Sequence, residues 1–94
     1  MSQFIETLEQ IIKDRKQNPL PGSYTTSLFE KGLDRILKKI GEEAGEVIIA
    51  AKNNDTEELT NEAADLIYHL LVTLQHQNIS LDDVNTVLKA RHHS

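Results

Sequence analysis

The sequence predicts an all-α domain, and three observations support this fold class. Apolar residues recur every three or four positions in several segments, as they do on one face of a helix. No segment alternates apolar and polar residues convincingly enough to predict a strand. Aromatic residues make up only 4% of the chain. A core of Leu, Ile, Val and Ala is therefore expected, which suits helices packed closely along their length.

Four helices are expected along the chain. The first spans about residues 2–16 and ends before Pro19 and Pro21, because proline lacks an N–H and disfavours helix in the preceding residue. An irregular loop should continue through residues 23–26, followed by a short helical turn over 27–31 that Gly32 interrupts. Long helices are expected over about 33–53 and 56–76, the second capped by Asp55. A short last helix over 80–90 begins at the cap residue Ser80.

Size and hydropathy predict one domain, over residues 1–94, that pairs with a second copy. A chain of 94 residues is near the lower limit for burying a self-sufficient core. Residues 66–74 are apolar on nearly all sides of their helix, and such a helix is normally surrounded by protein. We therefore expect an antiparallel helical bundle completed by homodimerisation, with Tyr68 and Val72 on the outer side, at the interface.

Composition excludes several classes of function. A formal charge of −5 argues against general binding of nucleic acid or of anionic membranes, which needs a basic face. A nucleotide ligand stays open, because a divalent cation can bridge acidic side chains to phosphates. The chain has no cysteine, so thiol catalysis and disulfides are impossible. No apolar run reaches the roughly 18 residues of a membrane span, and no signal segment begins the chain, so a cytoplasmic protein is expected.

Two pairs of acidic residues lie on the two long helices, each pair three positions apart. Glu43 and Glu46 form the first pair, with Glu42 beside them, and Glu62 and Asp65 form the second. A single pair of this kind usually belongs to a solvated charged face, and a chain with 15 acidic residues contains some by chance.

The position of the two pairs gives them more weight. All four residues border the apolar stripes of their helices on one side. The short connection between the helices predicts an antiparallel hairpin. In that hairpin Glu46 lies at nearly the height of Glu62, and Glu43 matches Asp65 one turn further from the connection. Converging carboxylates repel one another unless a cation neutralises them. An all-oxygen ligand set favours Mg²⁺, or Mn²⁺, over zinc. A di-iron carboxylate bundle would need Glu-x-x-His at the pairs, which is absent.

Basic residues precede the first acidic pair on its helix. Lys39 lies one turn before Glu43 and either forms a salt bridge with it or binds phosphate oxygens beside the metal. Arg35 lies one turn further along and has the same two interpretations.

Three more side chains are candidates for the site. His69 follows Asp65 by four positions, and is either a buried core histidine or a residue that orients Asp65. Tyr24 and Thr25 either supply ordinary loop polarity or belong to a loop that folds over a substrate. In that second case Tyr24 would stack on a base or bind a phosphate.

Three stretches of sequence carry a resemblance to a known family. They are Gly22-Ser23-Tyr24-Thr25, then Lys39-Ile40-Gly41-Glu42-Glu43 with Glu46, and then residues 62–72, which read Glu-Ala-Ala-Asp-Leu-Ile-Tyr-His-Leu-Leu-Val. From about Phe4 to Leu88 the chain resembles the phosphoribosyl-ATP pyrophosphohydrolase family, within the all-α nucleoside-triphosphate pyrophosphatases. MazG-like and dimeric dUTP-hydrolysing relatives share only the broader pattern, Glu-x-x-Glu followed by Glu-x-x-Asp. The chain looks like the stand-alone form, without the cyclohydrolase domain found in fused relatives.

The resemblance implies an activity and roles for the acidic residues. The activity is hydrolysis of phosphoribosyl-ATP to phosphoribosyl-AMP and pyrophosphate, the second step of histidine biosynthesis. Magnesium is expected to activate a water for attack at phosphorus and to bridge the triphosphate to four ligands: Glu43, Glu46, Glu62 and Asp65. One of these carboxylates, or Glu42, is expected to accept the proton of that water. Lys39 and Arg35 would stabilise the departing pyrophosphate.

Two other functions are compatible with the same residues. One is a house-cleaning pyrophosphatase of the MazG or dimeric dUTPase type, which acts on ordinary or damaged nucleoside triphosphates with the same metal chemistry. The other is a non-catalytic helical dimerisation module whose acidic residues form a solvated surface.

Overall fold

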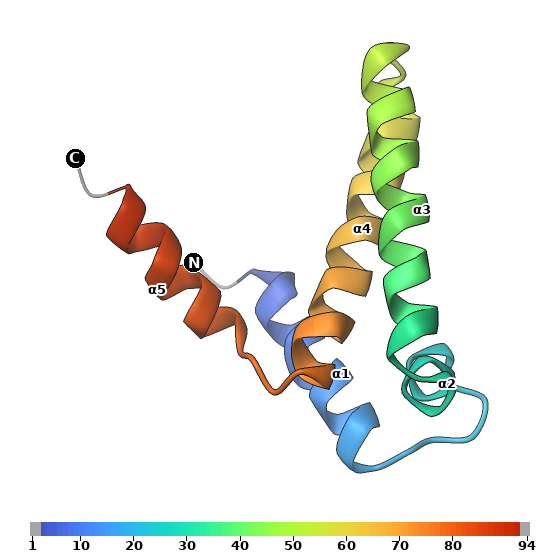
Figure 1. Ribbon diagram of the computed structural model, residues 1–94, viewed down its shortest axis with the longest axis vertical. Helices are drawn as coiled ribbons and strands as arrows, with labels where there is room; N and C mark the ends of the chain where they lie inside the picture. Colours follow the sequence, from blue (N-terminus) through green and yellow to red (C-terminus); the bar gives the residue numbers. More distant parts are fainter. Residues whose placement is uncertain (1–2, 93–94) are drawn as a thin grey trace.

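Five helices make up residues 3–92, the part of the chain that the computed structural model describes (Figure 1). They are α1 (Phe4–Gln17), α2 (Tyr24–Lys31), α3 (Leu33–Lys52), α4 (Thr56–His76) and α5 (Leu81–Arg91). Residues 3–92 contain no strand, which confirms the predicted all-α class. Among these five helices none has the length and apolar character needed to cross a bilayer.

The α3–α4 hairpin is the longest feature of the molecule, and its two helices lie side by side along their length (Figure 1). The turn between them is tightly specified. Asn54 adopts a left-handed conformation with φ of 56°, which asparagine tolerates better than most residues. Asp55 then caps α4, as predicted, because its carboxylate accepts a hydrogen bond of 3.0 Å from the Glu58 N–H. This turn sets the register between the two long helices.

The hydrophobic core lies near the open end of this hairpin, where α1 and α2 pack against it (Figure 1). Each of these four helices contributes at least one fully or almost fully buried side chain to the core: Ile12, Leu28, Ile36, Leu71 and Val72. The end of the hairpin near Asn54 has no such cover from the other helices (Figure 1). Packing therefore fixes the hairpin at one end only.

The start of α2 differs from the expectation of an irregular loop over residues 23–26. The helix begins at Tyr24, because the Ser23 side chain caps it by accepting a hydrogen bond of 3.1 Å from the Thr26 N–H. Thr25 and Thr26 are buried in the first turn of the helix. The predicted interruption at Gly32 is confirmed, since this residue has φ of 96°, which favours glycine.

The expected outward position of Tyr68 and Val72 is wrong. Val72 is fully buried, and Tyr68 packs against the core. The apolar side chains that α4 leaves exposed are Ile67 and Leu70, at 40% and 46%. A helix that is apolar on nearly all sides carries no single stripe, so its sequence could not show which side faces the core.

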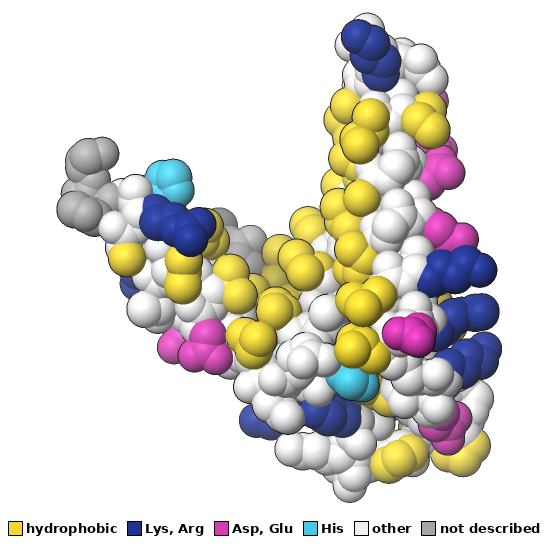
Figure 2. Space-filling model, in the orientation of Figure 1, with side chains coloured by type: hydrophobic (Ala, Val, Ile, Leu, Met, Phe, Trp, Pro, Cys, Tyr) yellow, Lys and Arg dark blue, Asp and Glu magenta, His cyan; other side chains and the backbone are white. Residues whose placement is uncertain are grey.

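The last helix, α5, projects away from the other four (Figure 1) and contains no buried residue. Ser80 caps it, as predicted, in a reciprocal capping box with Asp83. The helix is anchored at its first residue, where the Leu81 N–H donates to Glu9 Oε2 of α1 at 2.6 Å. Figure 2 shows apolar side chains exposed along the hairpin on the side toward α5, and on α5 itself.

Candidate metal centre

Three carboxylates from the hairpin form a compact group, called here the acid group: Glu43, Glu62 and Asp65. One carboxylate oxygen of each lies within 4.8 Å of the others. Glu43 comes from α3, while Glu62 and Asp65 are one turn apart on α4. The antiparallel register brings them together, as the count outward from the connection predicted for Glu43 and Asp65.

The fourth predicted ligand, Glu46, lies outside the acid group and is exposed. Glu42 is also exposed and forms an ion pair of 3.6 Å with Lys39. The expected partner of Lys39 was Glu43, so the salt bridge predicted for this lysine has a different acceptor. Arg35 is exposed on α3, two turns before the acid group.

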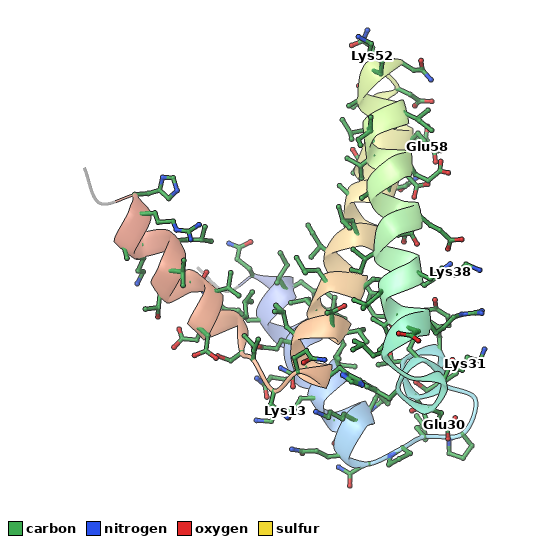
Figure 3. All side chains as sticks on the ribbon, in the orientation of Figure 1. Lys13, Glu30, Lys31, Lys38, Lys52 and Glu58 are labelled. Carbon is green, nitrogen blue, oxygen red and sulfur yellow. The ribbon has the colours of Figure 1, made fainter. Side chains whose placement is uncertain are left out.

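Within residues 3–92 no lysine or arginine forms an ion pair with the acid group, and its carboxylates repel one another. The pKa of Glu62 is raised from 4.5 to about 7, first by a hydrogen bond with Glu58, then by burial and by a hydrogen bond with Glu43. Glu58 (labelled in Figure 3) was not among the predicted site residues, although its spacing of four from Glu62 could have revealed it. An all-oxygen donor set under mutual repulsion fits a hard divalent cation such as Mg²⁺ or Mn²⁺.

His69 lies directly behind the acid group and is only 4% exposed. Its Nδ1 is 2.8 Å from the backbone oxygen of Asp65 and 3.7 Å from Glu43 Oε1. The predicted link to Asp65 therefore runs through the main chain, and the carboxylate near the ring belongs to Glu43. On the other side of the ring, Nε2 lies 3.1 Å from the Tyr24 hydroxyl.

Two tyrosines connect the start of α2 with α4. The rings of Tyr24 and Tyr68 are stacked with their centroids 6.1 Å apart, and both rings meet His69 edge-on. The Tyr68 hydroxyl is hydrogen-bonded to Thr25 Oγ1, and burial raises the pKa of this tyrosine. The Tyr24 ring is 52% exposed despite these contacts. Part of its surface is therefore open for stacking on a base, the role that sequence suggested.

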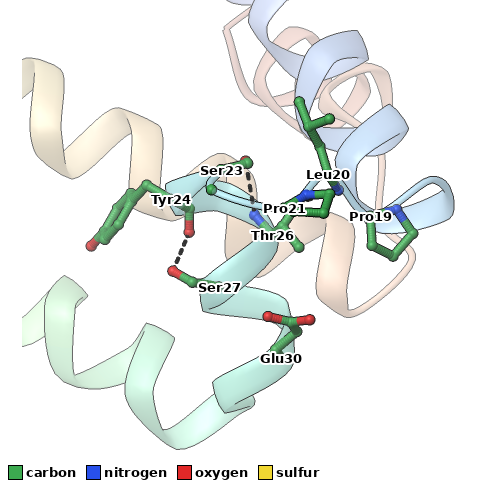
Figure 4. Close-up of a pocket in the computed structure, with 9 residues that line it drawn as sticks. Pro19, Leu20, Pro21, Ser23, Tyr24, Thr26, Ser27 and Glu30 are labelled. Atoms are coloured by element: carbon green, nitrogen blue, oxygen red, sulfur yellow. Dashed lines mark hydrogen bonds between the residues drawn. The ribbon is translucent and has the colours of Figure 1, made fainter.

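An open depression of about 620 Å³ lies beside the N-terminus of α2, away from the acid group. The residues that line it come from the loop before α2 and from α2 itself: Pro19, Leu20, Pro21, Gly22, Ser23, Tyr24, Thr26, Ser27 and Glu30. No member of the acid group contributes to this lining, and the Tyr24 ring points away from Pro19 and Glu30 (Figure 4). The depression is therefore separate from the acid group.

The chain is similar to one known protein family and to several curated proteins. Residues 5–92 match the family described as phosphoribosyl-ATP pyrophosphohydrolase. The chain is 59% identical over 88 residues to the phosphoribosyl-ATP pyrophosphatase of Streptococcus sanguinis, covering 94% of this chain and 85% of that protein. It is 58% identical over 87 residues to the protein of the same name from Clostridium botulinum, covering 93% of this chain and 79% of that protein.

A fused relative matches equally well. The histidine biosynthesis bifunctional protein HisIE of Bacillus subtilis is 62% identical over 89 residues, which are 95% of this chain. The chain spans only 43% of the length of that protein. The match to the family covers nearly all of residues 3–92, including every member of the acid group. The chain therefore belongs to the phosphoribosyl-ATP pyrophosphohydrolase family.

Proposed function

We propose that this chain hydrolyses phosphoribosyl-ATP to phosphoribosyl-AMP and pyrophosphate in histidine biosynthesis, with magnesium bound at the acid group. The observation that carries the proposal is the convergence of Glu43, Glu62 and Asp65 within 4.8 Å on a chain of this family. Histidine biosynthesis also appears in the name of the Bacillus relative. A cytoplasmic location, in keeping with a biosynthetic role, stays a prediction.

The acid group would hold the ion, and Glu46, one turn along α3 and open to solvent, would complete the ligand set. When bound, magnesium supplies positive charge to the phosphate oxygens and acidifies a water for in-line attack at phosphorus. A carboxylate oxygen of Glu46 or Glu42 would accept the proton of that water, because both side chains are exposed beside the group.

The basic residues of α3 would bind the product that leaves. The Lys39 ammonium already lies beside an acidic side chain at the edge of the site. Arg35 lies one turn further along the helix, about 6 Å away in axial rise. Together they would contact the oxygens of the departing pyrophosphate and offset the charge that develops there. Tyr24 and Thr25, at the start of α2, stay candidates for contact with the nucleotide.

The test is an assay of pyrophosphate release from phosphoribosyl-ATP, with and without magnesium. Activity should require the metal, and Glu43→Gln should lower kcat/KM by about 100-fold or more while the helical circular dichroism is kept. Glu46→Gln should also abolish turnover, and retained activity would remove Glu46 from the site. Turnover without a divalent cation would contradict the proposal.

The two alternative functions give different results in simple experiments. A house-cleaning pyrophosphatase would release pyrophosphate from ATP or dUTP at rates comparable with those on phosphoribosyl-ATP. A non-catalytic module would show no change in Tm on adding millimolar magnesium. The proposed enzyme should be stabilised by mass action once the metal concentration exceeds its Kd.

We further propose that the functional form is a homodimer. The chain exposes 6679 Å², whereas a compact monomer of 10.6 kDa exposes about 5,500 Å². Its radius of gyration is 14.5 Å, against about 12.4 Å for a compact 94-residue domain. The hairpin and α5 both expose large apolar side chains (Figure 2). The residues involved include Leu37, Ile48, Ile49, Ile67, Leu70, Val87 and Leu88.

A further inference from the structure

Two tyrosine hydroxyl groups take part in hydrogen bonds between α2 and α4, and only one of them contacts a residue beside the acid group. The Tyr24 hydroxyl meets His69 Nε2 at 3.1 Å, and the opposite edge of that ring faces Asp65 and Glu43. The other hydroxyl is that of Tyr68, which bonds to Thr25. The Tyr24–His69 bond thus leads toward the acidic residues, whereas the Tyr68–Thr25 bond joins only α2 and α4 and serves as its matched control.

The hydrogen bonds around His69 determine where its proton lies. Nδ1 faces the carbonyl oxygen of Asp65 at 2.8 Å, and a carbonyl oxygen only accepts, so Nδ1 must carry a hydrogen. In the neutral ring Nε2 is then an acceptor, and the Tyr24 hydroxyl donates to it. Without that donor, the ring loses one of the two partners that hold this orientation.

The fixed Nδ1–H also acts on a carboxylate of the acid group. Glu43 Oε1 lies 3.7 Å from Nδ1, and the two side chains are only 12% and 5% exposed. Water therefore screens their interaction weakly, and the N–H dipole favours a carboxylate oxygen at this side of the ring. A neutral histidine is sufficient for this effect. This attraction would favour the arrangement in which Oε1 of Glu43 faces the ring.

We propose that Tyr24 is a positioning residue: through His69 it orients Glu43 for cation binding. The inference rests on the proposed function, because it assumes that the acid group binds a divalent cation. Tyr24 itself lies at the first position of α2, next to the cap residue Ser23. The helix that follows the proline-containing loop is thus coupled to the metal centre through one hydroxyl group.

The experiment compares Tyr24→Phe with Tyr68→Phe in direct binding of Mn²⁺, measured from the electron paramagnetic resonance signal of the free ion. Each variant removes one hydroxyl from the α2–α4 contact and keeps an aromatic ring. Tyr24→Phe should weaken Mn²⁺ binding about 10- to 100-fold, the usual effect of removing a group that orients a ligand. Tyr68→Phe should leave the Kd of Mn²⁺ unchanged, and circular dichroism should show both variants folded.

A second measurement reports on the histidine itself. The ¹⁵N chemical shifts of the His69 ring, assigned with His69→Asn, should show the Nδ1–H tautomer in the wild type. In Tyr24→Phe the shift of Nε2 should change, because this nitrogen loses its hydrogen-bond donor while the Asp65 carbonyl still favours the Nδ1–H form. His69→Asn retains an N–H group near the position of Nδ1 and removes the acceptor for Tyr24. In that background, Tyr24→Phe should therefore add no further loss of Mn²⁺ affinity.

The outcomes separate this inference from the proposed function. Wild-type protein that binds no Mn²⁺ would remove the metal centre and the positioning role with it. Wild-type binding with an unchanged Kd in Tyr24→Phe, or an Nε2–H tautomer in the wild type, would overturn the role of Tyr24 alone. Equal losses in Tyr24→Phe and Tyr68→Phe would also overturn it, since that result indicates a general effect of α2 docking.

Discussion

Among the members of the acid group, Glu62 has a pKa that its neighbours raise to about 7. Its carboxyl group shares hydrogen bonds with Glu58 and Glu43, and a carboxyl that donates to another must hold a proton. The pKa of about 7 therefore applies to the Glu62 carboxyl group when no cation is bound. A divalent cation at the acid group would replace that proton as the source of positive charge.

Cation binding should consequently weaken as the pH falls through 7. Below the pKa of about 7 the ion must displace a proton from Glu62, so the affinity for Mg²⁺ or Mn²⁺ should fall by up to about tenfold per pH unit. Glu58→Gln removes the largest cause of the raised pKa and should move the midpoint of this pH dependence downward. Isothermal titration calorimetry at several pH values measures the effect. Glu57→Gln, in the same exposed turn, is the matched control and should leave the midpoint in place.

The stability of the metal-free protein should change with pH in the corresponding direction. The folded-state pKa of Glu62 is raised above 4.5, so folding favours the protonated form. The contribution of this group to stability is therefore greatest below pH 4.5 and is lost as the pH rises toward 7. Adding magnesium should raise Tm more at pH 8 than at pH 5. A larger effect of magnesium at pH 5 would contradict the assignment of Glu62 as a ligand.

At the scale of single helices, the bounds of a helix could be predicted from sequence where one strong cap residue or a long apolar pattern determines them. The bounds of α4 match the prediction of 56–76, because Asp55 is a strong cap and the apolar pattern is long. The start of α2 was missed because its cap, Ser23, follows directly on a proline–glycine turn that indicated a loop. The signal was nevertheless present, since serine is one of the residues preferred as an N-cap.

The candidate site was predictable as far as it depends on register within one hairpin. Counting residues outward from the short connection placed Glu43 opposite Asp65, and these two residues do meet. The same count placed Glu46 opposite Glu62, but Glu62 lies beside Glu43 instead. Contacts that depend on tertiary packing were not predictable in the same way. The bond between Tyr24 and His69 joins residues 45 positions apart, and no periodicity in either helix indicates it.

The hairpin turn should be sensitive to loss of its cap. Asp55→Ala removes the oxygen that accepts from the Glu58 N–H, which should destabilise the protein by about 1 kcal/mol. Asp55→Asn keeps an acceptor in the same position and should be nearly neutral. Urea unfolding at one fixed protein concentration measures both variants. Equal stability of the alanine and asparagine variants would show that the capping bond does not stabilise the turn.

At the scale of the whole molecule, the open shape and the exposed apolar surface have one common explanation. A projecting α5 and a hairpin covered at one end only leave apolar side chains of both elements exposed on the same side (Figures 1 and 2). The apolar segment 66–74 predicted a homodimer with Tyr68 and Val72 on the outer side, but both side chains pack in or against the core of one chain. Val72 belongs to the core of one chain, so Leu70 and Ile67 are the residues of α4 that the proposed interface would use.

A charge placed on that surface should separate the two copies. Leu70→Glu puts a carboxylate where the proposed interface excludes water, and burying an unpaired charge is strongly unfavourable. Sedimentation velocity at micromolar concentration should show a dimer for the wild type and a monomer for Leu70→Glu. Leu20→Glu is the matched control, because Leu20 is 48% exposed against 46% for Leu70 but lies in the loop before α2. If both variants sediment as the wild type does, Leu70 lies outside the interface. A monomeric wild type would instead mean that one chain is stable with its apolar surface in water.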